Sequence, residues 1–390
     1  MWNTVPHLGA ASALAVATPL AESSPMPADG TRTPEKLAPE SAAKRIAGLD
    51  GVRGLAILAV MANHTGVGVA AGGYLGVDIF FVLSGYLITG ILLANRRREG
   101  VLQLPRFYGR RAARLMPALV VAVAGGFALH SYLGESRGAA WRGAWIAALY
   151  LQDLALNIGF VHTQLWNHTW TLAIEEHFYL VWPLVLLALH SRGWTTRMIE
   201  AALAAATVYG VIALSVWFHP SSSPTSAVYY RPDARCGALF LGALLALHLQ
   251  QTDWCPPPWT GWTALAGLIV LLTQAGAANS RSAVTACIPL TWLLTAWLLW
   301  ALRRPSWLTR TMSVRPLPWI GLISYGLYLY HPIVFRVVSI HSGEPRHVAA
   351  PIAIALSAVV ATGSWYLIER PVLAWSHRRF AAPHRAGAAT

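Results

Sequence analysis

The stretch Arg53-Gly-Leu-Ala-Ile-Leu-Ala-Val-Met-Ala-Asn-His64 is an apolar helical segment with an ionisable side chain at each end. Eleven steps at about 100° come to about 1100°, only about 20° past three turns, so Arg53 and His64 project from one helix face. At about 1.5 Å per residue they stand roughly 16 Å apart, about half the thickness of a bilayer core. Ionisable groups inside membrane helices are costly and commonly functional. The pair therefore indicates a helix whose one end binds an anion while its middle does proton chemistry.

The composition is that of a helical membrane protein that crosses the bilayer several times. The chain has 390 residues, of which 55% are apolar and only 12% charged, about half the charge of an average soluble domain. Its 18 tryptophans are typical of side chains that anchor helices at membrane interfaces. The net charge of +13 comes from basic residues between apolar segments, where membrane topology explains them better than nucleic-acid binding does.

The sequence gives no sign of a metal, disulfide or nucleotide site. Cys236, Cys255 and Cys287 are odd in number and widely spaced, so neither a disulfide framework nor a zinc site is indicated. No P-loop or dinucleotide-binding glycine fingerprint is present. We therefore expect no metal and no permanently bound cofactor.

Ten apolar runs have the length of a membrane span. They cover residues 50–70, 74–94, 115–133, 171–190, 198–218, 235–249, 260–277, 283–302, 318–340 and 349–369. Residues 141–160 form a weaker eleventh candidate, interrupted by Gln152, Asp153 and Asn157. The predicted fold is all-α, a bundle of about ten transmembrane helices, which we assign to a domain over 46–375.

The distribution of arginine predicts the orientation of the chain. If 141–160 is a re-entrant or interfacial segment and not a span, the arginine-rich loops near 96–114, 192–197, 303–315 and 378–379 all face the cytoplasm. We expect both termini to be cytoplasmic in a bacterial plasma membrane. Residues 1–45, rich in Ala, Pro, Ser and Thr, are expected to be a disordered extension or the result of a start codon placed too early. Residues 376–390 are expected to be a cytoplasmic tail.

This topology predicts a polar pathway with two different ends. Arg53 and the arginines before the third span lie on the inner side, and the expected outer half collects the remaining polar groups: His64, Asp78, Glu175, Glu176, Asp233 and His331. A histidine can take a proton from a hydroxyl, helped by a carboxylate, and a guanidinium suits phosphate. Together they indicate group transfer from a phosphate-rich donor. Each residue also has a structural alternative: His64 in helix packing, Arg111 and Arg114 as topological anchors, and Asp78 in a helix cap or ion pair.

Seven sequence blocks occur in the order of a known family. They are Leu49-Asp-Gly-Val-Arg53-Gly-Leu-Ala with His64, Gly76-Val-Asp78-Ile-Phe-Phe-Val-Leu-Ser84-Gly85, Phe107-Tyr-Gly-Arg-Arg111-Ala-Ala-Arg114-Leu-Met-Pro117, Trp170-Thr-Leu-Ala-Ile-Glu175-Glu176, Arg231-Pro-Asp233-Ala-Arg-Cys-Gly237, Ile323-Ser324-Tyr-Gly-Leu-Tyr328-Leu-Tyr-His331-Pro and Ile368-Glu369-Arg-Pro371. Over roughly residues 45–375 the chain resembles the acyltransferase-3 family of integral membrane O-acyltransferases. The family usually has Ser where this chain has Thr171, which keeps the hydroxyl.

The resemblance implies transfer of an acyl group from acyl-CoA, as co-substrate, to a hydroxyl acceptor. It implies that Arg53 and His64 are essential, and that Arg111 and Arg114 help to hold CoA. His64 would deprotonate the hydroxyl for direct attack, with Glu175 or Glu176 stabilising its charge; an acyl-enzyme on Ser84 or His64 is the variant. The blocks carry six supporting residues: Asp78, Ser84, Asp233, Ser324, Tyr328 and His331.

The acceptor is expected to be a sugar-containing molecule. Residues after 375 hold no esterase-like domain, so the resemblance implies the short, single-domain form, whose acceptors are surface polysaccharides or natural products. The composition, rich in Ala, Arg and Gly and poor in Lys, is typical of a high-GC bacterium and favours a natural product such as a macrolide. The alternative is a transporter of a sugar or lipid-linked substrate, which predicts paired half-repeats; no convincing repeat is seen.

Overall fold

The structure, a computed structural model, describes residues 47–134, 136–160, 164–218, 227–278 and 280–380. These residues form helices and connecting turns with no strand among them, so the predicted all-α class is confirmed. The expected N-terminal extension over 1–45 lies outside the described residues. Of the expected tail, residues 376–379 continue a helix and 381–390 lie outside the described part.

The long helices are α1 (Ala47–His64), α2 (Gly76–Glu99), α3 (Leu104–Tyr132), α6 (Trp170–Ser191), α7 (Thr196–Val216), α8 (Pro232–His248), α9 (Pro258–Gln274), α10 (Ile288–Ala301), α13 (Ser324–His341) and α14 (Arg346–Ser364). The shorter helices are α4 (Arg137–Ala148), α5 (Gln152–Asn157), α11 (Trp307–Met312), α12 (Pro316–Leu322) and α15 (Arg370–Arg379). The 3₁₀-helical segments η1 (Gly73–Leu75), η2 (Gln164–Thr169) and η3 (Ala227–Tyr230) and the π-helical segments η4 (Ala283–Cys287) and η5 (Trp365–Glu369) extend or connect them.

Six segments of the described chain are long and apolar enough to cross a membrane. They are Gly73–Glu99, Leu104–Tyr132, Leu165–Ser191, Thr196–Val216, Ala283–Ala301 and Arg346–Arg379. The expected count of ten spans is therefore not confirmed. The other four expected ranges fall on α1, α8, α9 and α13, helices of 17 or 18 residues. Such helices reach about 26 Å, slightly less than a bilayer core of about 30 Å.

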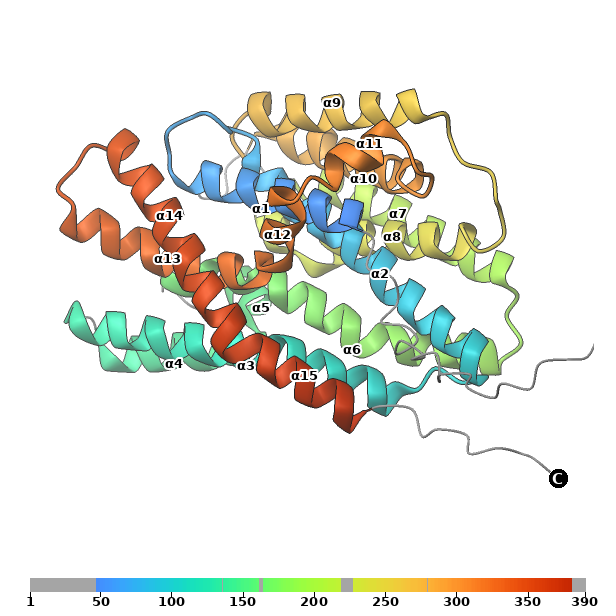
Figure 1. The fold of residues 1–390 in the computed structure, drawn as a ribbon, viewed down its shortest axis with the longest axis horizontal. Coiled ribbons are helices and arrows are strands. Elements are labelled where there is room, and N and C mark those ends of the chain that lie inside the picture. The colour runs from blue at the N-terminus through green and yellow to red at the C-terminus, as the bar shows by residue number, and fades with distance from the viewer. Residues whose placement is uncertain (1–46, 135, 161–163, 219–226, 279, 381–390) are drawn as a thin grey trace, which may run out of the picture. The chain divides into compact units, whose positions relative to one another are not determined.

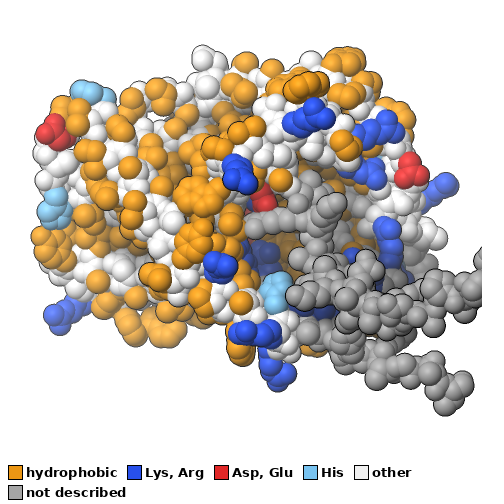
Figure 2. All heavy atoms as spheres, in the orientation of Figure 1, with side chains coloured by type: hydrophobic (Ala, Val, Ile, Leu, Met, Phe, Trp, Pro, Cys, Tyr) orange, Lys and Arg blue, Asp and Glu red, His pale blue; other side chains and the backbone are white. Residues whose placement is uncertain are grey.

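Large apolar side chains cover much of the surface of these helices. Val120 on α3, Val208 on α7, Leu293 on α10 and Val359 on α14 are 63%, 56%, 59% and 68% exposed. Figure 2 shows hydrophobic side chains across most of the visible face, with most Lys and Arg side chains in the right half of the view. Apolar surface of this extent is suited to lipid and not to water. The chain is a multi-pass membrane protein.

Helix α1 lies inside the bundle. Its residues Val52, Ala56, Ile57 and Val60 are fully buried, and it packs against α2, α12 and α13. Figure 1 shows α1 and α12 near the middle of the view, α13 and α14 together at the left and α15 beside α3 along the lower edge. Because most of its apolar side chains are enclosed, α1 holds its polar ends in fixed positions within the bundle.

Two glycines let α2 and α8 cross at close range. A Cβ atom at Gly85 would collide with the backbone oxygen of Leu239, and one at Gly242 would collide with the backbone oxygen of Val82. Small residues at such crossings are typical of membrane helices, which associate by close backbone packing. This contact fixes α2, which carries Ser84, against α8.

The segment 141–160, expected not to span, folds as the short helices α4 and α5 with a turn between them. The chain reverses through Leu149–Leu151, where Tyr150 has a φ of 55°. Helix α4 packs on α3, and α5 packs on α6. At 12 and 6 residues, neither helix is long enough to cross a bilayer.

Candidate active site

A small cavity collects the arginines and much of the polar chemistry expected from the sequence. We call it the arginine cavity. It has a volume of about 160 Å³ and is lined by Arg53, Val77, Phe80, Phe81, Ser84, Arg111, Arg114, Leu115, Thr171, Leu172, Glu175, Tyr179, Ser324, Tyr325 and Tyr328. These side chains come from α1, α2, α3, α6 and α13, segments far apart in the sequence.

Glu175 accepts two hydrogen bonds at the wall of this cavity. The Ser84 hydroxyl donates to its Oε1 over 2.8 Å, and the Tyr179 hydroxyl donates to its Oε2 over 3.1 Å. A carboxylate hydrogen-bonded to a serine can act as the base that activates it. The arrangement gives the cavity a paired hydroxyl and carboxylate in addition to its guanidinium groups.

The arginines of the cavity are held by protein partners, on other helices for Arg111 and Arg114 and on the same helix for Arg53. Arg111 donates to Glu176 Oε1 over 3.3 Å, and its guanidinium lies 3.2 Å from the centre of the Tyr179 ring. Arg114 donates to the backbone oxygen of Leu322 over 3.0 Å. Arg53 lies 3.6 Å from Asp50 on its own helix. Planar guanidinium groups held in this way suit phosphate oxygens.

A cluster of histidines lies beyond the arginine cavity. The ring centres of His64 and His331 are 5.0 Å apart, and those of His331 and His168 are 5.7 Å apart. Nδ1 of His64 lies 2.8 Å from the Val60 carbonyl oxygen, and Nδ1 of His331 lies 3.0 Å from that of Leu327. A carbonyl only accepts, so the proton of each neutral ring is on Nδ1. Nε2 of each ring is then the nitrogen that can accept a proton.

Tyr328 connects the arginine cavity to this histidine cluster. Its hydroxyl accepts a hydrogen bond from Thr171 over 2.7 Å and donates to the backbone oxygen of His168, also over 2.7 Å. Its ring centre is 5.8 Å from that of His331. Tyr328 also lines the arginine cavity. The residue thus forms part of the wall between the arginines and the histidines.

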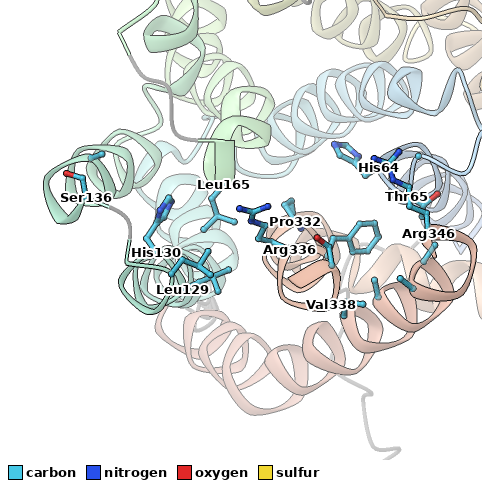
Figure 3. A pocket seen from close by; sticks show the side chains of 18 residues that line it. His64, Thr65, Leu129, His130, Ser136, Leu165, Pro332, Arg336, Val338 and Arg346 are labelled. Atoms are coloured by element: carbon cyan, nitrogen blue, oxygen red, sulfur yellow. The ribbon is translucent and has the colours of Figure 1, made fainter. Parts of the chain in front are cut away.

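His64 opens into a second, larger cavity, which we call the histidine cavity. It has a volume of about 790 Å³ and is lined by His64, Thr65, Gly66, Leu129, His130, Leu133, Ser136, Ala139, Leu165, Pro332, Phe335, Arg336, Val338, Ser339, Arg346, Ala349, Ala350 and Ala353. Figure 3 shows His64, Arg336 and Arg346 facing a gap whose far side carries His130 and Ser136. His64 is exposed, so a molecule in this cavity can reach the imidazole.

Arg53 and His64 therefore belong to two different cavities. The two residues stand roughly 16 Å apart along α1. Ser84, Arg111, Arg114, Ser324 and Tyr328 join Arg53 at the arginine cavity, and His331 lies between the two cavities.

The structure places Glu175 and Glu176 among the arginines, and neither carboxylate contacts His64 within the described part of the chain. Glu175 lines the arginine cavity, and Glu176 pairs with Arg111. The reason is that the helical segment begins at Leu165, so Glu175 lies about 15 Å inside it and not at its outer end. The ring contact that the structure gives His64 is to another histidine, His331.

Asp78 and Asp233 line neither cavity. Asp78 is fully buried and accepts hydrogen bonds from Arg235 over 3.0 Å and from Trp292 over 2.7 Å, which joins α2 to α8 and α10. Asp233 pairs with Arg231 over 2.8 Å, and both side chains are 33% exposed. Partial burial raises the pKa of Asp233, but the Arg231 guanidinium outweighs it and holds the pKa below its ordinary value.

Several residues in the two cavities and in the histidine cluster between them were not predicted. Tyr179 follows Glu175 by four residues, the spacing that places two side chains on one helix face, so the sequence contained a signal for it. His168, Arg336 and Arg346 gave no such signal, because their neighbours come from distant segments.

Comparison with known proteins identifies similar sequences over the same region. The family described as an acyltransferase domain matches residues 46–370. The peptidoglycan O-acetyltransferase OatA of Listeria monocytogenes is 30% identical over 348 residues, 84% of this chain and 56% of the relative. The putative peptidoglycan O-acetyltransferase YrhL of Bacillus subtilis is 29% identical, covering 86% of this chain and 56% of the relative. The O-acetyltransferase OatA of Staphylococcus aureus is also 29% identical, with 86% and 58% coverage.

The chain spans a little over half the length of these curated relatives. No solved structure matches it.

Proposed function

Because this chain belongs to the acyltransferase-3 family, we propose that it is a membrane O-acyltransferase that moves an acyl group from acyl-CoA to a hydroxyl of a cell-surface glycan. The observation that carries the proposal is the pair of cavities reached from one helix, with Arg53 at the first and His64 at the second. A group-transfer enzyme has to bring two substrates together, and each cavity offers the chemistry that one of them requires.

The arginine cavity supports a phosphate-bearing thioester donor. Three guanidinium groups, from Arg53, Arg111 and Arg114, converge on a volume of about 160 Å³. This volume is too small for a whole nucleotide, so only the phosphate end of CoA would lie at the arginines, and the arm would point away from them toward the histidines.

The histidine cavity supports the hydroxyl acceptor. His64 Nε2 takes the proton of the acceptor hydroxyl as its oxygen attacks the thioester carbonyl. The new C–O ester bond forms, the C–S bond breaks, and the CoA thiolate leaves and takes up the proton from His64. A two-step route through Ser84, with Glu175 as its base, is the variant that the 2.8 Å hydrogen bond between them supports.

The names of the relatives favour a glycan acceptor over a macrolide. The relatives in Listeria and Bacillus carry peptidoglycan in their names, and a sugar hydroxyl in a surface polymer fits a cavity of about 790 Å³. The transporter alternative lacks such support, because the matched family is one of acyltransferases.

The test is acyl transfer in membranes that contain the full chain. With acetyl-CoA labelled in the acetyl group, the wild type should release free thiol and form labelled ester in equal amounts. His64→Ala should lower the rate by at least about 100-fold, the typical contribution of a general base, at unchanged protein abundance.

His190→Ala is the matched control. His190 also directs Nδ1 at a carbonyl four residues earlier, that of Leu186 over 2.7 Å, but it lines neither cavity. Its rate should remain that of the wild type. Movement of a sugar across the membrane with no thiol release would favour the transporter and overturn the proposal.

A further inference from the structure

Two arginines in the histidine cavity have no part in the chemistry described above. Arg336 on α13 and Arg346 at the start of α14 both line the cavity into which His64 opens. Figure 3 shows both side chains among those that surround the gap, with Arg346 close to His64 and Thr65. None of the lining residues that the structure describes is acidic. The cavity therefore presents two positive charges beside the proposed base.

The two helices present these arginines from continuous faces. On α13 the lining residues Pro332, Arg336 and Ser339 are three or four positions apart, and on α14 Arg346 and Ala350 follow the same spacing. This spacing is that of a single helix face. Both arginines thus belong to the parts of α13 and α14 that line the cavity.

Neither guanidinium is neutralised within the described part of the protein. Arg336 and Arg346 form no ion pair, hydrogen bond or ring contact with any described residue. The arginines of the other cavity differ, since Arg53 and Arg111 each have a carboxylate partner. An uncompensated pair of guanidinium groups in one pocket is suited to an anion supplied by a ligand.

Topology does not account for these arginines either. In the orientation expected from the sequence, α13 ends and α14 begins on the side away from the cytoplasm, where membrane proteins carry few positive charges.

Gly66, two residues after His64, leaves room for the side chain of Arg346. A Cβ atom at Gly66 would lie 3.2 Å from Nη1 of Arg346, and the glycine has a φ of +67°. The guanidinium therefore lies against the turn that follows the base.

We propose that the histidine cavity selects an acceptor that carries an anionic group, a carboxylate or a phosphate, which Arg336 and Arg346 bind while a hydroxyl of the same molecule faces His64. This inference rests on the proposed function, because it names the class of acceptor for the same reaction. A cavity of about 790 Å³ is large enough for an acidic sugar unit.

The test compares three acceptors that share one sugar ring. They are N-acetylglucosamine, which is neutral, N-acetylmuramic acid, which adds a carboxylate, and N-acetylglucosamine 1-phosphate, which adds a phosphate. With the full chain in detergent micelles and acetyl-CoA as donor, we expect the KM of at least one anionic acceptor to be on the order of tenfold below that of the neutral one. Which anionic acceptor shows the lower KM identifies the group.

Substitution of the arginines should remove this preference. Arg336→Gln and Arg346→Gln should each raise the KM for the preferred anionic acceptor on the order of tenfold, with kcat and the KM for N-acetylglucosamine unchanged. The lysine variants should recover part of the affinity, since they keep the charge but lose the planar donor pair. Arg142→Gln on α4 is the matched control, an exposed arginine that lines neither cavity; it should behave as the wild type.

Equal KM values for neutral and anionic acceptors, or equal losses for both in the arginine variants, would overturn the inference and leave the acyltransferase proposal intact. If the wild type acylates none of the three, the thermal stabilisation of the full chain by each sugar tests the anion site independently of acyl transfer. Stabilisation by an anionic sugar that disappears in Arg336→Gln would keep the anion site and reject the acyl transfer. No difference between the sugars would reject both.

Discussion

At the scale of single residues, the site depends on which hydrogen bonds hold each polar side chain. His64 and His331 are oriented by backbone carbonyls of their own helices, which leaves Nε2 of each ring to the chemistry. Glu175 is oriented by side chains of two helices, Ser84 on α2 and Tyr179 on α6. The histidines are therefore set locally, whereas Glu175 requires the assembled bundle.

Substitution of Glu175 by glutamine should reduce activity without unfolding the protein. The amide keeps the shape of the side chain but replaces one of two acceptor oxygens by a donor, so the hydrogen bond from Ser84 or Tyr179 is lost. We expect a loss of about 10- to 100-fold in kcat, which corresponds to one charge-assisted hydrogen bond. The measurement is labelled ester formation at matched protein abundance. Glu200→Gln, on α7 and away from both cavities, is the control; equal effects of both substitutions would contradict the role given to Glu175.

Asp78 should matter for stability and not for the chemical step. Replacing it by alanine leaves Arg235 charged and fully buried, which costs about 3–5 kcal/mol. Thermal unfolding in detergent should show a large loss for Asp78→Ala. Asp233→Ala breaks an ion pair that is 33% exposed, and we expect it to lower the free energy of unfolding by only about 0–1 kcal/mol.

Activity per folded molecule separates stability from chemistry at Asp78. The folded fraction of Asp78→Ala should keep the kcat of the wild type. A stable variant with no activity would show that Asp78 acts in the reaction.

At the scale of elements, close helix packing positions the side chains that line the cavities. Gly242 on α8 allows α2 to approach, and α2 carries Ser84 into the arginine cavity. Gly242→Ala should lower stability by about 1–3 kcal/mol, the usual effect of overpacking, and should lower activity with it. Gly90 on the same helix α2 has no atom within 4 Å of its Cβ position. Gly90→Ala should therefore be neutral or slightly stabilising. Thermal unfolding of the two variants compares their stabilities, and equal losses would contradict the role given to Gly242.

The sequence predicted the positions of the helices along the chain better than it predicted which side chains on different helices contact one another. Apolar runs located α6 and α7 within a few residues, because burial in lipid requires continuous apolar stretches. Helix α3 begins at Leu104, well before the expected start at 115, because its first turns are rich in arginine. The pairing of Glu176 with Arg111 depends on how α6 lies against α3, and no local pattern encodes that register. The sequence also placed the start of the fourth helical segment at residue 171, whereas η2 extends it back to Leu165.

At the scale of the whole described bundle, each of the two cavities is lined by helices that are far apart in the sequence. The placement of Arg53 and His64 on one helix could be predicted from the sequence, since both lie on α1. The arginines of the histidine cavity could not, because α3, α4, α13 and α14 enclose it together with α1. The separation between the cavities is the basis of our proposal that the donor binds at the arginines and the acceptor at the histidines.

The most direct test of this division is the KM of both substrates in two variants of the full chain. Arg53→Gln should raise the KM for acyl-CoA on the order of tenfold and leave the KM for the acceptor unchanged. Arg336→Gln should do the reverse, raising only the KM for the anionic acceptor. If Arg53→Gln instead raised the KM for the acceptor, or if both variants changed both constants equally, the assignment of one substrate to each cavity would be wrong.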